Sequence, residues 1–247
     1  MQVSINTAVF LTDLQAGKSQ FECLKTLVGK PIDNVEIRGE FLAEETQAQE
    51  LAKIETLCAT QNWGLYLSVP EQLFTEGSLN SQLQDYLDLA TKYHLKGLKM
   101  GLGDARHFSL NTVGQLHAML AAFPGQLTIE NQPNEFGTLP EFEVCAKALL
   151  EAVPKLGYTF DSGNWYWTGT EPELAFKTLK NAITVFHLKD IANHDTVMLG
   201  DGDTKWAQMV QALRPNIPVF LEYAITTNAF DDEIAKVAAV LKKRKNI

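Results

Sequence analysis

Three acidic residues and one histidine stand at or near the ends of four consecutive predicted strands. Glu130, Asp161 and Glu222 each end a strand, and His187 lies close to the end of its own. The four residues are 31, 26 and 35 residues apart, about one strand-and-helix unit each, so we expect them to converge. Three neighbouring carboxylates must either bind protons or share a cation. The sequence therefore predicts a site for one divalent metal ion.

The donor types indicate which metals would suit this site. One imidazole and three carboxylates form a mostly hard set of ligands, which favours Mn²⁺, Co²⁺, Mg²⁺ or Zn²⁺ over a thiolate-binding metal. The alternative interpretation is that each acid pairs with a nearby lysine or arginine and only stabilises the structure. That interpretation is adequate for any single acid, but it explains poorly why all four residues share one inward-facing position at strand ends.

The elements that would position these residues alternate between strands and helices along the whole chain. The candidate strands cover residues 3–8, 34–38, 64–69, 96–101, 126–130, 157–161, 183–189 and 217–222. Helical patterns lie between them, as at 43–61 and 78–94, and the last covers 233–245. Strands that alternate with helices form a parallel sheet with right-handed crossovers. Units of about 30 residues favour a closed (β/α)₈ TIM barrel, which we expect to be a single domain over 1–247.

Side chains within the strands alternate between two kinds, which indicates two different faces. One set is apolar and should face the helices: Val35, Ile37, Leu65, Leu67, Val69, Leu98, Met100, Ile129, Phe160, Phe186 and Leu221. The other set is mostly polar and should point into the barrel: Ser4, Asn6, Glu36, Arg38, Tyr66, Ser68, Lys99, Glu130, Thr159, Asp161, His187, Lys189 and Glu222. Polar groups are costly to bury without partners, so this set is expected at the barrel mouth, where active sites lie. An open, doubly wound sheet is the alternative, but no GxGxxG motif follows the first strand.

Composition argues against several classes of protein. Hydrophobic residues make up 45% of the 247 residues, enough for a large core. The formal net charge of −9 argues against nucleic acid and anionic membranes as partners. Cys23, Cys58 and Cys145 have no CxxC spacing and are expected to be small buried residues rather than disulfides. Neither a signal peptide nor an apolar run of about 18 residues is visible, so we expect a cytoplasmic protein without a membrane span.

Six short motifs, in order along the chain, resemble those of one enzyme family. They are VEIRGE (35–40), IENQ (129–132), FDSGNWYW (160–167), HLKD (187–190), LGDGDTKW (199–206) and FLEYAI (220–225). Together they resemble the sugar phosphate isomerase/epimerase family of the xylose-isomerase-like TIM barrels, over nearly the whole chain. The resemblance implies that the metal ligands are Glu130, Asp161, His187 and Glu222. It also implies that Glu130 and Glu222 form the acid/base pair, as in the epimerases of that family.

The residues suit this chemistry in their own right. Moving a carbonyl group, or inverting the carbon beside it, requires the removal of an α-proton. A metal ion polarises the carbonyl and stabilises the enediolate, while one carboxylate removes the proton and another can return it. We therefore expect a metal-dependent isomerase or epimerase, with Glu130 and Glu222 as the catalytic pair. Its substrate would be a small sugar, a sugar phosphate or a related hydroxy-ketone.

Three basic residues of the inward-facing set are candidates for substrate binding. Arg38 ends the second strand and could bind a carboxylate or phosphate through two hydrogen bonds. Its alternative role is a salt bridge to Glu36 or Glu40. Lys99 and Lys189 could hold sugar oxygens or neutralise the acids of the barrel.

Two residues in the segment after the sixth strand are also candidates for substrate binding. Asn164 follows Asp161 by three residues. Many related enzymes have a histidine at this position, so the asparagine leaves a hydrogen-bonding role rather than a proton-transfer role. Trp165, together with Trp167, could form an apolar wall over a sugar or could simply cap the barrel.

The sequence argues against one alternative function and leaves two others open. A DNA-cleaving enzyme of the endonuclease IV type would need histidines in the third and fourth strands, which contain none. A metal-dependent dehydratase of a cyclic polyol ketone, resembling inosose dehydratase, would use the same metal and bases. Nothing in the sequence separates that reaction from epimerisation. A non-catalytic sugar-binding barrel is a further alternative, because fold alone does not imply catalysis.

The sequence says little about assembly. Phe74 and Phe108, which we expect on exposed loops, are candidates for a homodimer contact or a lid. Isolated apolar residues on a surface are ordinary, so a homodimer is one option among others.

Overall fold

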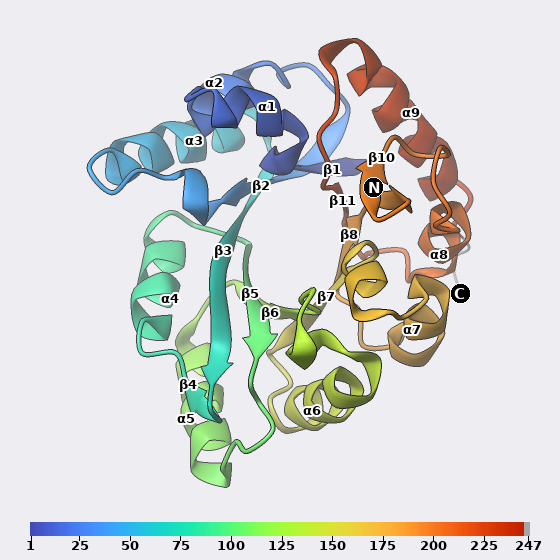
Figure 1. Ribbon diagram of the computed structural model, residues 1–247. Coiled ribbons are helices and arrows are strands. Elements are labelled where there is room, and N and C mark those ends of the chain that lie inside the picture. The colour runs from blue at the N-terminus through green and yellow to red at the C-terminus, as the bar shows by residue number, and fades with distance from the viewer. Residues whose placement is uncertain (245–247) are drawn as a thin grey trace.

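A closed barrel of eight parallel strands, surrounded by helices, forms the centre of the computed structural model, which describes residues 1–244 (Figure 1). The barrel strands are β1 (Val3–Asn6), β2 (Ile32–Arg38), β3 (Gly64–Thr75), β5 (Gly97–Gly103), β6 (Gln126–Glu130), β7 (Gly157–Asp161), β8 (Val185–Leu188) and β11 (Val219–Leu221). Successive strands pair in parallel, and the pairing of β1 with β11 closes the barrel. The predicted (β/α)₈ TIM barrel is confirmed.

Helices follow the barrel strands and cover the outside of the barrel (Figure 1). They are α1 (Leu11–Gln15), α2 (Gln20–Lys25), α3 (Gln47–Gln61), α4 (Leu83–Lys92), α5 (Leu110–Ala122), α6 (Leu139–Ala152), α7 (Pro172–Leu179), α8 (Trp206–Ala212) and α9 (Phe230–Leu241). The side chains of Ser19 and Ser109 accept backbone hydrogen bonds at the starts of α2 and α5, which stabilises these helix ends. Within residues 1–244, the helices are too short or too polar to span a lipid bilayer.

Several short elements lie in the connections. The 3₁₀ helices are η1 (Thr7–Phe10), η2 (Gly39–Phe41), η3 (Glu135–Gly137), η4 (Asn164–Thr168) and η5 (Thr227–Ala229). The strand β4 (Ser78–Leu79) pairs with the end of β3, and β9 (Asp190–Ala192) forms an antiparallel hairpin with β10 (Asp195–Val197).

The segment after the third strand differs from its prediction. The strand β3 continues to Thr75, beyond the predicted end at residue 69, and the chain then turns back into β4. Glu76 and Gly77 form this turn with positive φ angles of 50° and 75°. The helix predicted over 78–94 therefore begins only at Leu83, because strand pairing outweighs the local helical pattern. Residue 245 of the last predicted helix lies outside the described residues.

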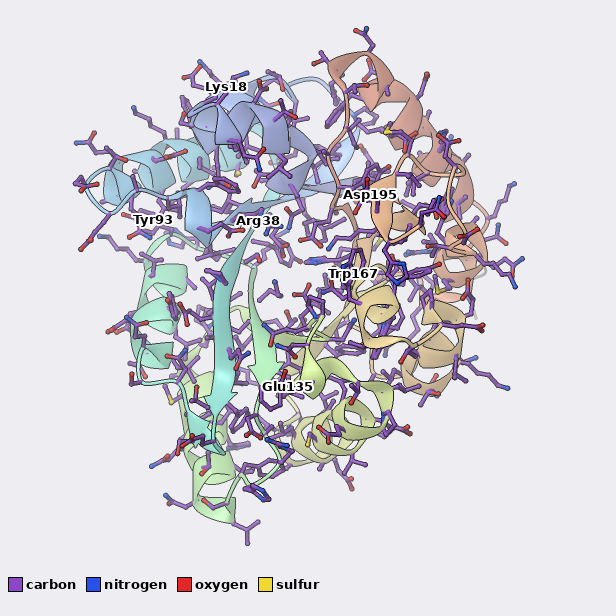
Figure 2. All side chains as sticks on the ribbon, viewed as in Figure 1. Lys18, Arg38, Tyr93, Glu135, Trp167 and Asp195 are labelled. Carbon is purple, nitrogen blue, oxygen red and sulfur yellow. The ribbon has the colours of Figure 1, made fainter. Side chains whose placement is uncertain are left out.

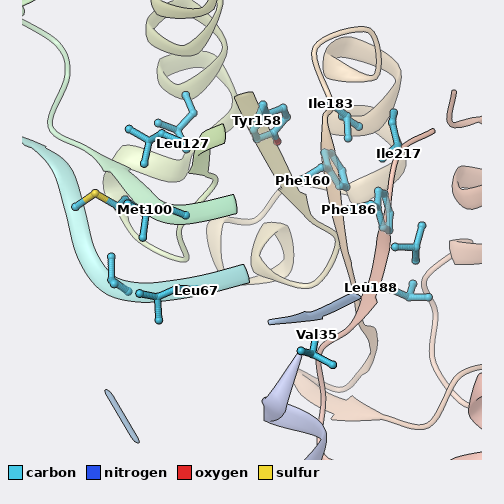
Figure 3. Packing of buried hydrophobic residues seen from close by; sticks show 14 of the residues in the cluster. Val35, Leu67, Met100, Leu127, Tyr158, Phe160, Ile183, Phe186, Leu188 and Ile217 are labelled. Atoms are coloured by element: carbon cyan, nitrogen blue, oxygen red, sulfur yellow. The ribbon is translucent and has the colours of Figure 1, made fainter. Parts of the chain in front are cut away.

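The apolar set of the strands is buried between the barrel and the helices (Figure 3). Phe160 and Phe186 stack with their ring centroids 5.3 Å apart, and Phe160 packs edge-on against Phe176 of α7. Inside the barrel, polar side chains pair with one another, as where Thr159 Oγ1 donates to Thr128 Oγ1 at 2.7 Å. Burial of the apolar face is the main favourable contribution to folding, and it orients the polar face toward the barrel axis.

Phe74 does not lie on an exposed loop. It is fully buried in the extended part of β3, and its ring centroid lies 6.1 Å from that of Phe108. Phe108 is itself partly buried against the same core. The prediction of an exposed aromatic pair was wrong because β3 is longer than its pattern indicates. These two residues stabilise the β3–β4 extension and offer little surface for a dimer contact.

Candidate functional site

The four predicted metal ligands lie at the same mouth of the barrel. Glu130 and Asp161 are the last residues of β6 and β7, and His187 is the third residue of β8. Glu222 directly follows β11. These strands are neighbours in the order β6, β7, β8 and β11. One donor atom from each residue lies within 4.8 Å of the others, so the structure brings the four side chains together.

The donor set fits a divalent cation. The Nδ1 atom of His187 lies 3.0 Å from Glu130 Oε1 and 2.8 Å from Glu222 Oε2, and all four side chains are buried. Two buried atoms, His187 Nε2 and Glu222 Oε2, have no well-directed hydrogen bond to any of the described residues. Carboxylates and a single imidazole are donors that hard divalent ions prefer, and unsatisfied buried donors call for a ligand. The cluster could therefore hold a metal ion.

Two lysines neutralise part of this cluster. Lys99 Nζ donates to Glu130 Oε2 at 2.7 Å. Lys189 Nζ donates to Asp161 Oδ2 at 2.6 Å. The structure thus places both lysines beside predicted metal ligands, which agrees with their alternative role as partners of the acids. Their contact with a substrate remains a prediction.

Arg38 lies between the cluster and the surface. Its Nη1 atom donates to Glu222 Oε1 at 3.0 Å, and its Nε atom donates to Glu40 Oε1 at 2.7 Å. Figure 2 shows Arg38 on the inner side of the ring of helices. The guanidinium therefore joins a buried acid to a partly exposed one, and the predicted salt bridge to Glu40 is present.

Burial and neighbouring charges shift the pKa values of the two acids on β6 and β7 in opposite directions. Burial alone raises the pKa of Glu130, but the charge of Lys99 and a hydrogen bond from His187 outweigh it and lower the pKa to about 2. Burial dominates at Asp161 and raises its pKa to about 6, although the charge of Lys189 opposes this shift. The two carboxyls therefore differ in how readily they bind a proton.

The other two members of the cluster form a charged pair. Burial lowers the pKa of His187, but the charges of Glu222 and Glu36 outweigh it and raise the pKa well above 6.5. Burial raises the pKa of Glu222, but the charges of His187 and Lys189 outweigh it and hold the pKa well below 4.5. A cation bound at this point would take over the role of the protonated imidazole.

Glu36 and Asn6 join the cluster from β2 and β1, and neither was predicted as a site residue. Glu36 Oε1 lies 3.0 Å from His187 Nε2. Asn6 Nδ2 donates to Glu36 Oε1 at 2.6 Å and to Glu222 Oε1 at 3.3 Å. Both side chains are buried. Their inward-facing position was the available signal, but contacts with residues far along the chain depend on how the barrel closes.

Gln132 is a further polar group that sequence reasoning missed. It follows Glu130 by two residues, and Glu130 pairs in register with Gly101 of β5. The Gln132 amide occupies the space beside Gly101, where any Cβ atom would overlap it. The Oε1 atom of Gln132 is buried and has no hydrogen-bond partner within the part of the chain that the structure describes. Its place in the IENQ motif was the signal that could have found it.

Asn164 uses its amide donor within the protein. Its Nδ2 atom donates to the backbone carbonyl of Asn131 at 2.9 Å, and its backbone N–H donates to Asp161 Oδ1 at 2.9 Å. These bonds hold the start of η4 against the ends of β6 and β7. A role of Asn164 in substrate binding remains a prediction.

The placement of Trp165 corrects the prediction that it faces a substrate. Its side chain is fully buried, with its ring centroid 6.0 Å from that of Phe142 and 5.8 Å from that of Phe160. Because Phe142 and Phe160 belong to the core outside the barrel, the η4 turn directs Trp165 away from the mouth. Trp167 of the same turn is 47% exposed and packs edge-on against His194 of the β9–β10 hairpin (Figure 2).

Comparison with known proteins supports the assignment of the fold. No known family profile and no curated protein matches the sequence. The probable 3-DHS dehydratase AsbF from Bacillus anthracis is a similar solved structure, with 18% identity and a TM-score of 0.69, covering 99% of this chain and 100% of that chain. A D-tagatose 3-epimerase-like protein has 16% identity and a TM-score of 0.67, covering 99% and 97%. The 3-keto-D-glucoside 4-epimerase YcjR from E. coli has 13% identity and a TM-score of 0.65, covering 97% and 99%.

The structural neighbours are xylose isomerase-like TIM barrel proteins, which include epimerases, a dehydratase and xylose isomerase domain proteins. This agrees with the family resemblance of the sequence motifs. At these identities the likeness shows the fold.

Proposed function

We propose that this protein is a metal-dependent isomerase or epimerase of a small sugar, a sugar phosphate or a related hydroxy-ketone. The observation that carries the proposal is the geometry around His187, whose Nδ1 lies 3.0 Å from Glu130 and 2.8 Å from Glu222. Two carboxylates from the non-adjacent strands β6 and β11 therefore meet at one point of the mouth. The names of the structural neighbours, sugar epimerases and a dehydratase, support an enzyme with this type of chemistry.

In the proposed reaction, different residues of the site would bind the metal ion, transfer the proton and orient the base. The divalent ion would be held by Glu130, Asp161, His187 and Glu222. Once bound, it would polarise the carbonyl of the substrate and neutralise the charge of the enediolate. Glu130 and Glu222 come from the ends of non-adjacent strands, and in the proposed mechanism one would remove the α-proton while the other would deliver a proton to the opposite face. Lys99 would keep the Glu130 carboxylate oriented through its hydrogen bond.

A dehydratase of a cyclic polyol ketone is the second candidate. The likeness to a probable 3-DHS dehydratase favours it. In that reaction one carboxylate would remove the α-proton, and the β-hydroxyl would leave as water after receiving a proton from the other acid. A non-catalytic sugar-binding barrel is the third candidate, in which the same side chains would bind a sugar without proton transfer.

Solvent exchange separates these candidates. The Mn²⁺-loaded protein would be incubated in D₂O with free and phosphorylated ketoses, and the products would be followed by NMR. We expect deuterium at the carbon beside the carbonyl, together with a rearranged sugar, and neither in EDTA-treated protein. A dehydrated product would favour the second candidate. Sugar binding without exchange for any substrate of the panel would contradict an enzyme and support the binding barrel.

A further inference from the structure

The side-chain amide of Gln132 lies inside the barrel mouth, beside the end of β5. Lys99 and Gly101 are two residues apart in this strand and face the same side of it, and the Lys99 side chain points inward to Glu130. A Cβ atom on Gly101 would therefore also point inward. Such an atom would lie 2.1–2.4 Å from the carbon, nitrogen and oxygen of the Gln132 amide. The amide thus takes the place of an inward-facing side chain next to Glu130, with which Gly101 pairs in register.

The backbone of Gln132 is fixed by the turn that follows it. Gly137 of η3 comes so close that a Cβ atom there would lie 1.7 Å from the carbonyl oxygen of Gln132. The backbone N–H of Gly137 donates to the carbonyl of Asn134 at 3.0 Å, and the Asn134 side chain accepts from the N–H of Phe136 at 3.1 Å. Pro133 also restricts the backbone directly after Gln132. A backbone that is fixed before binding lowers the entropy cost of using the side chain in recognition.

The amide oxygen of Gln132 is buried, yet it accepts no hydrogen bond from any residue between 1 and 244. Most buried polar atoms of proteins have a partner, because an unpaired one is costly. The other unpaired atoms of the described chain belong to the metal cluster, at His187 and Glu222, or lie away from the mouth, at Trp165 and Arg244. Gln132 as a whole is partly exposed, so a small molecule can reach its amide from the mouth. The oxygen is therefore available to a donor group of a bound substrate.

We propose that Gln132 is a specificity-determining residue whose amide oxygen accepts a hydrogen bond from one hydroxyl group of the substrate. The inference rests on the proposed function and adds a residue that selects among its substrates. A substrate without that hydroxyl leaves the buried oxygen unpaired, so the site discriminates against it. An amide does not exchange its charge state near neutral pH, so Gln132 would bind the substrate without transferring a proton. The reacting carbons belong beside the metal ligands, so the selected hydroxyl is one farther along the sugar.

The binding of D-fructose and of its 4-, 5- and 6-deoxy derivatives tests this inference. Calorimetric titration of the Mn²⁺-saturated protein gives the dissociation constant of each sugar. We expect one deoxy sugar to bind at least about tenfold more weakly than D-fructose, because it leaves a buried acceptor unpaired. Gln132→Met keeps the length of the side chain but removes the amide. In this variant the difference between the same two sugars should fall to about twofold or less, because the deletion of both partners isolates their interaction.

A second variant, Gly101→Ala, tests the position of the amide while Gln132 itself is kept. The added methyl group would overlap the amide, which is the flexible end of a side chain and can move, so the preference for the hydroxyl should again be lost. Gln115→Met and Gly114→Ala, at exposed positions of α5, are the matched controls and should retain the preference. Circular dichroism checks the fold of each variant. An unchanged preference in either folded site variant would overturn the inference, as would equal affinities of the wild-type protein for all four sugars.

The failure of this inference can be distinguished from the failure of the proposed function. Mn²⁺ binding and α-proton exchange would be measured on the same preparations. A protein that binds Mn²⁺ and exchanges the α-protons of ketoses, but binds D-fructose and its deoxy derivatives equally, would contradict the inference alone. A protein that binds Mn²⁺ but neither binds nor exchanges any of the sugars would contradict both.

Discussion

At the scale of single residues, Glu130 and Glu222 both contact His187 but accept hydrogen bonds from different further donors. Glu130 accepts a hydrogen bond from Lys99, whereas Glu222 accepts from Arg38 and Asn6. Other residues thus hold each carboxylate in place. In a glutamine, which has the same shape, the amide oxygen could still accept hydrogen bonds from these donors. A change from Glu to Gln therefore removes the base while it keeps the volume of the side chain.

We expect Glu130→Gln and Glu222→Gln each to lower kcat by at least about 100-fold, because a general acid or base contributes about 10²–10⁴-fold. The fold should be retained, as checked by circular dichroism. The measurement is the rate of deuterium exchange at saturating Mn²⁺. Glu143→Gln, on the surface of α6, is the control and should be fully active. A turnover rate within a few-fold of wild type in either site variant would rule out the two-base mechanism.

Metal binding should release protons, with a dependence on pH that follows from the pKa shifts. The pKa of His187 lies well above 6.5, mainly because the charges of Glu222 and Glu36 overcome the effect of burial, so its imidazole is protonated at pH 7 in the metal-free protein. The raised pKa of Asp161, about 6, adds a second proton near pH 5. Because a metal ligand must be deprotonated, Mn²⁺ affinity should rise with pH.

Calorimetry in two buffers of different ionisation enthalpy measures this release. We expect about one proton per Mn²⁺ at pH 7 and more at pH 5. His187→Ala should bind Mn²⁺ more weakly and should lose the release at pH 7. An unchanged metal affinity and stoichiometry in His187→Ala would show that the ligand assignment is wrong.

At the scale of elements, one buried carboxylate organises the connection after β8. Asp190, the first residue of β9, accepts backbone hydrogen bonds from Gly200, Gly202 and Thr204 at 2.8–3.1 Å. These bonds close the loop that leads to α8. Thr204 also contacts the hydroxyl of Tyr166 at 3.1 Å, so the loop is connected to η4 beside the site.

We expect Asp190→Ala to lower the free energy of unfolding by about 1.5–3 kcal/mol or more, because several N–H groups lose a charged acceptor. Urea denaturation measures this change. Asp195→Ala in β10 is the matched control, because Asp195 is exposed and, among residues 1–244, accepts a hydrogen bond only from the backbone of Thr196. Its effect should stay within about 0.5 kcal/mol. Similar losses in both variants would show that Asp190 does not organise the loop.

At the scale of the whole molecule, stability comes from the layer between the barrel and its helices. Phe142 of α6 is fully buried, and its ring centroid lies 5.2 Å from that of Tyr158 on β7 and 6.0 Å from that of Trp165. This contact joins one helix, one strand and the η4 turn. Removing it would leave a cavity that rigid neighbouring elements can fill only in part.

We expect Phe142→Ala to cost about 3–5 kcal/mol of the free energy of unfolding, with a single cooperative transition. Val144→Ala, on the same helix but 70% exposed, should change it by less than about 0.5 kcal/mol. Urea denaturation with equal m-values provides the comparison. A loss below about 1 kcal/mol in Phe142→Ala would mean that the layer can repack around the missing ring.

The sequence by itself determined the barrel class, most strand positions and the inward face of each strand. These features are local, because alternation of side chains follows from the geometry of a single extended strand. The convergence of Glu130, Asp161, His187 and Glu222 also followed from the sequence, since parallel strands end at the same mouth. Their functional roles remain proposals.

Only the tertiary structure decided which side chains contact one another. Asn6 meets Glu222 across 216 residues because barrel closure pairs the first strand with the last, and Glu36 of β2 meets His187 of β8 because both side chains point into the closed barrel. Trp165 turned into the core, and β3 ran past its predicted end, because packing and strand pairing outweighed local pattern. The physical reason is that the hydrophobic period and the composition of a segment describe one helix or strand at a time. Contacts between side chains of different strands depend on the register and curvature of the whole barrel.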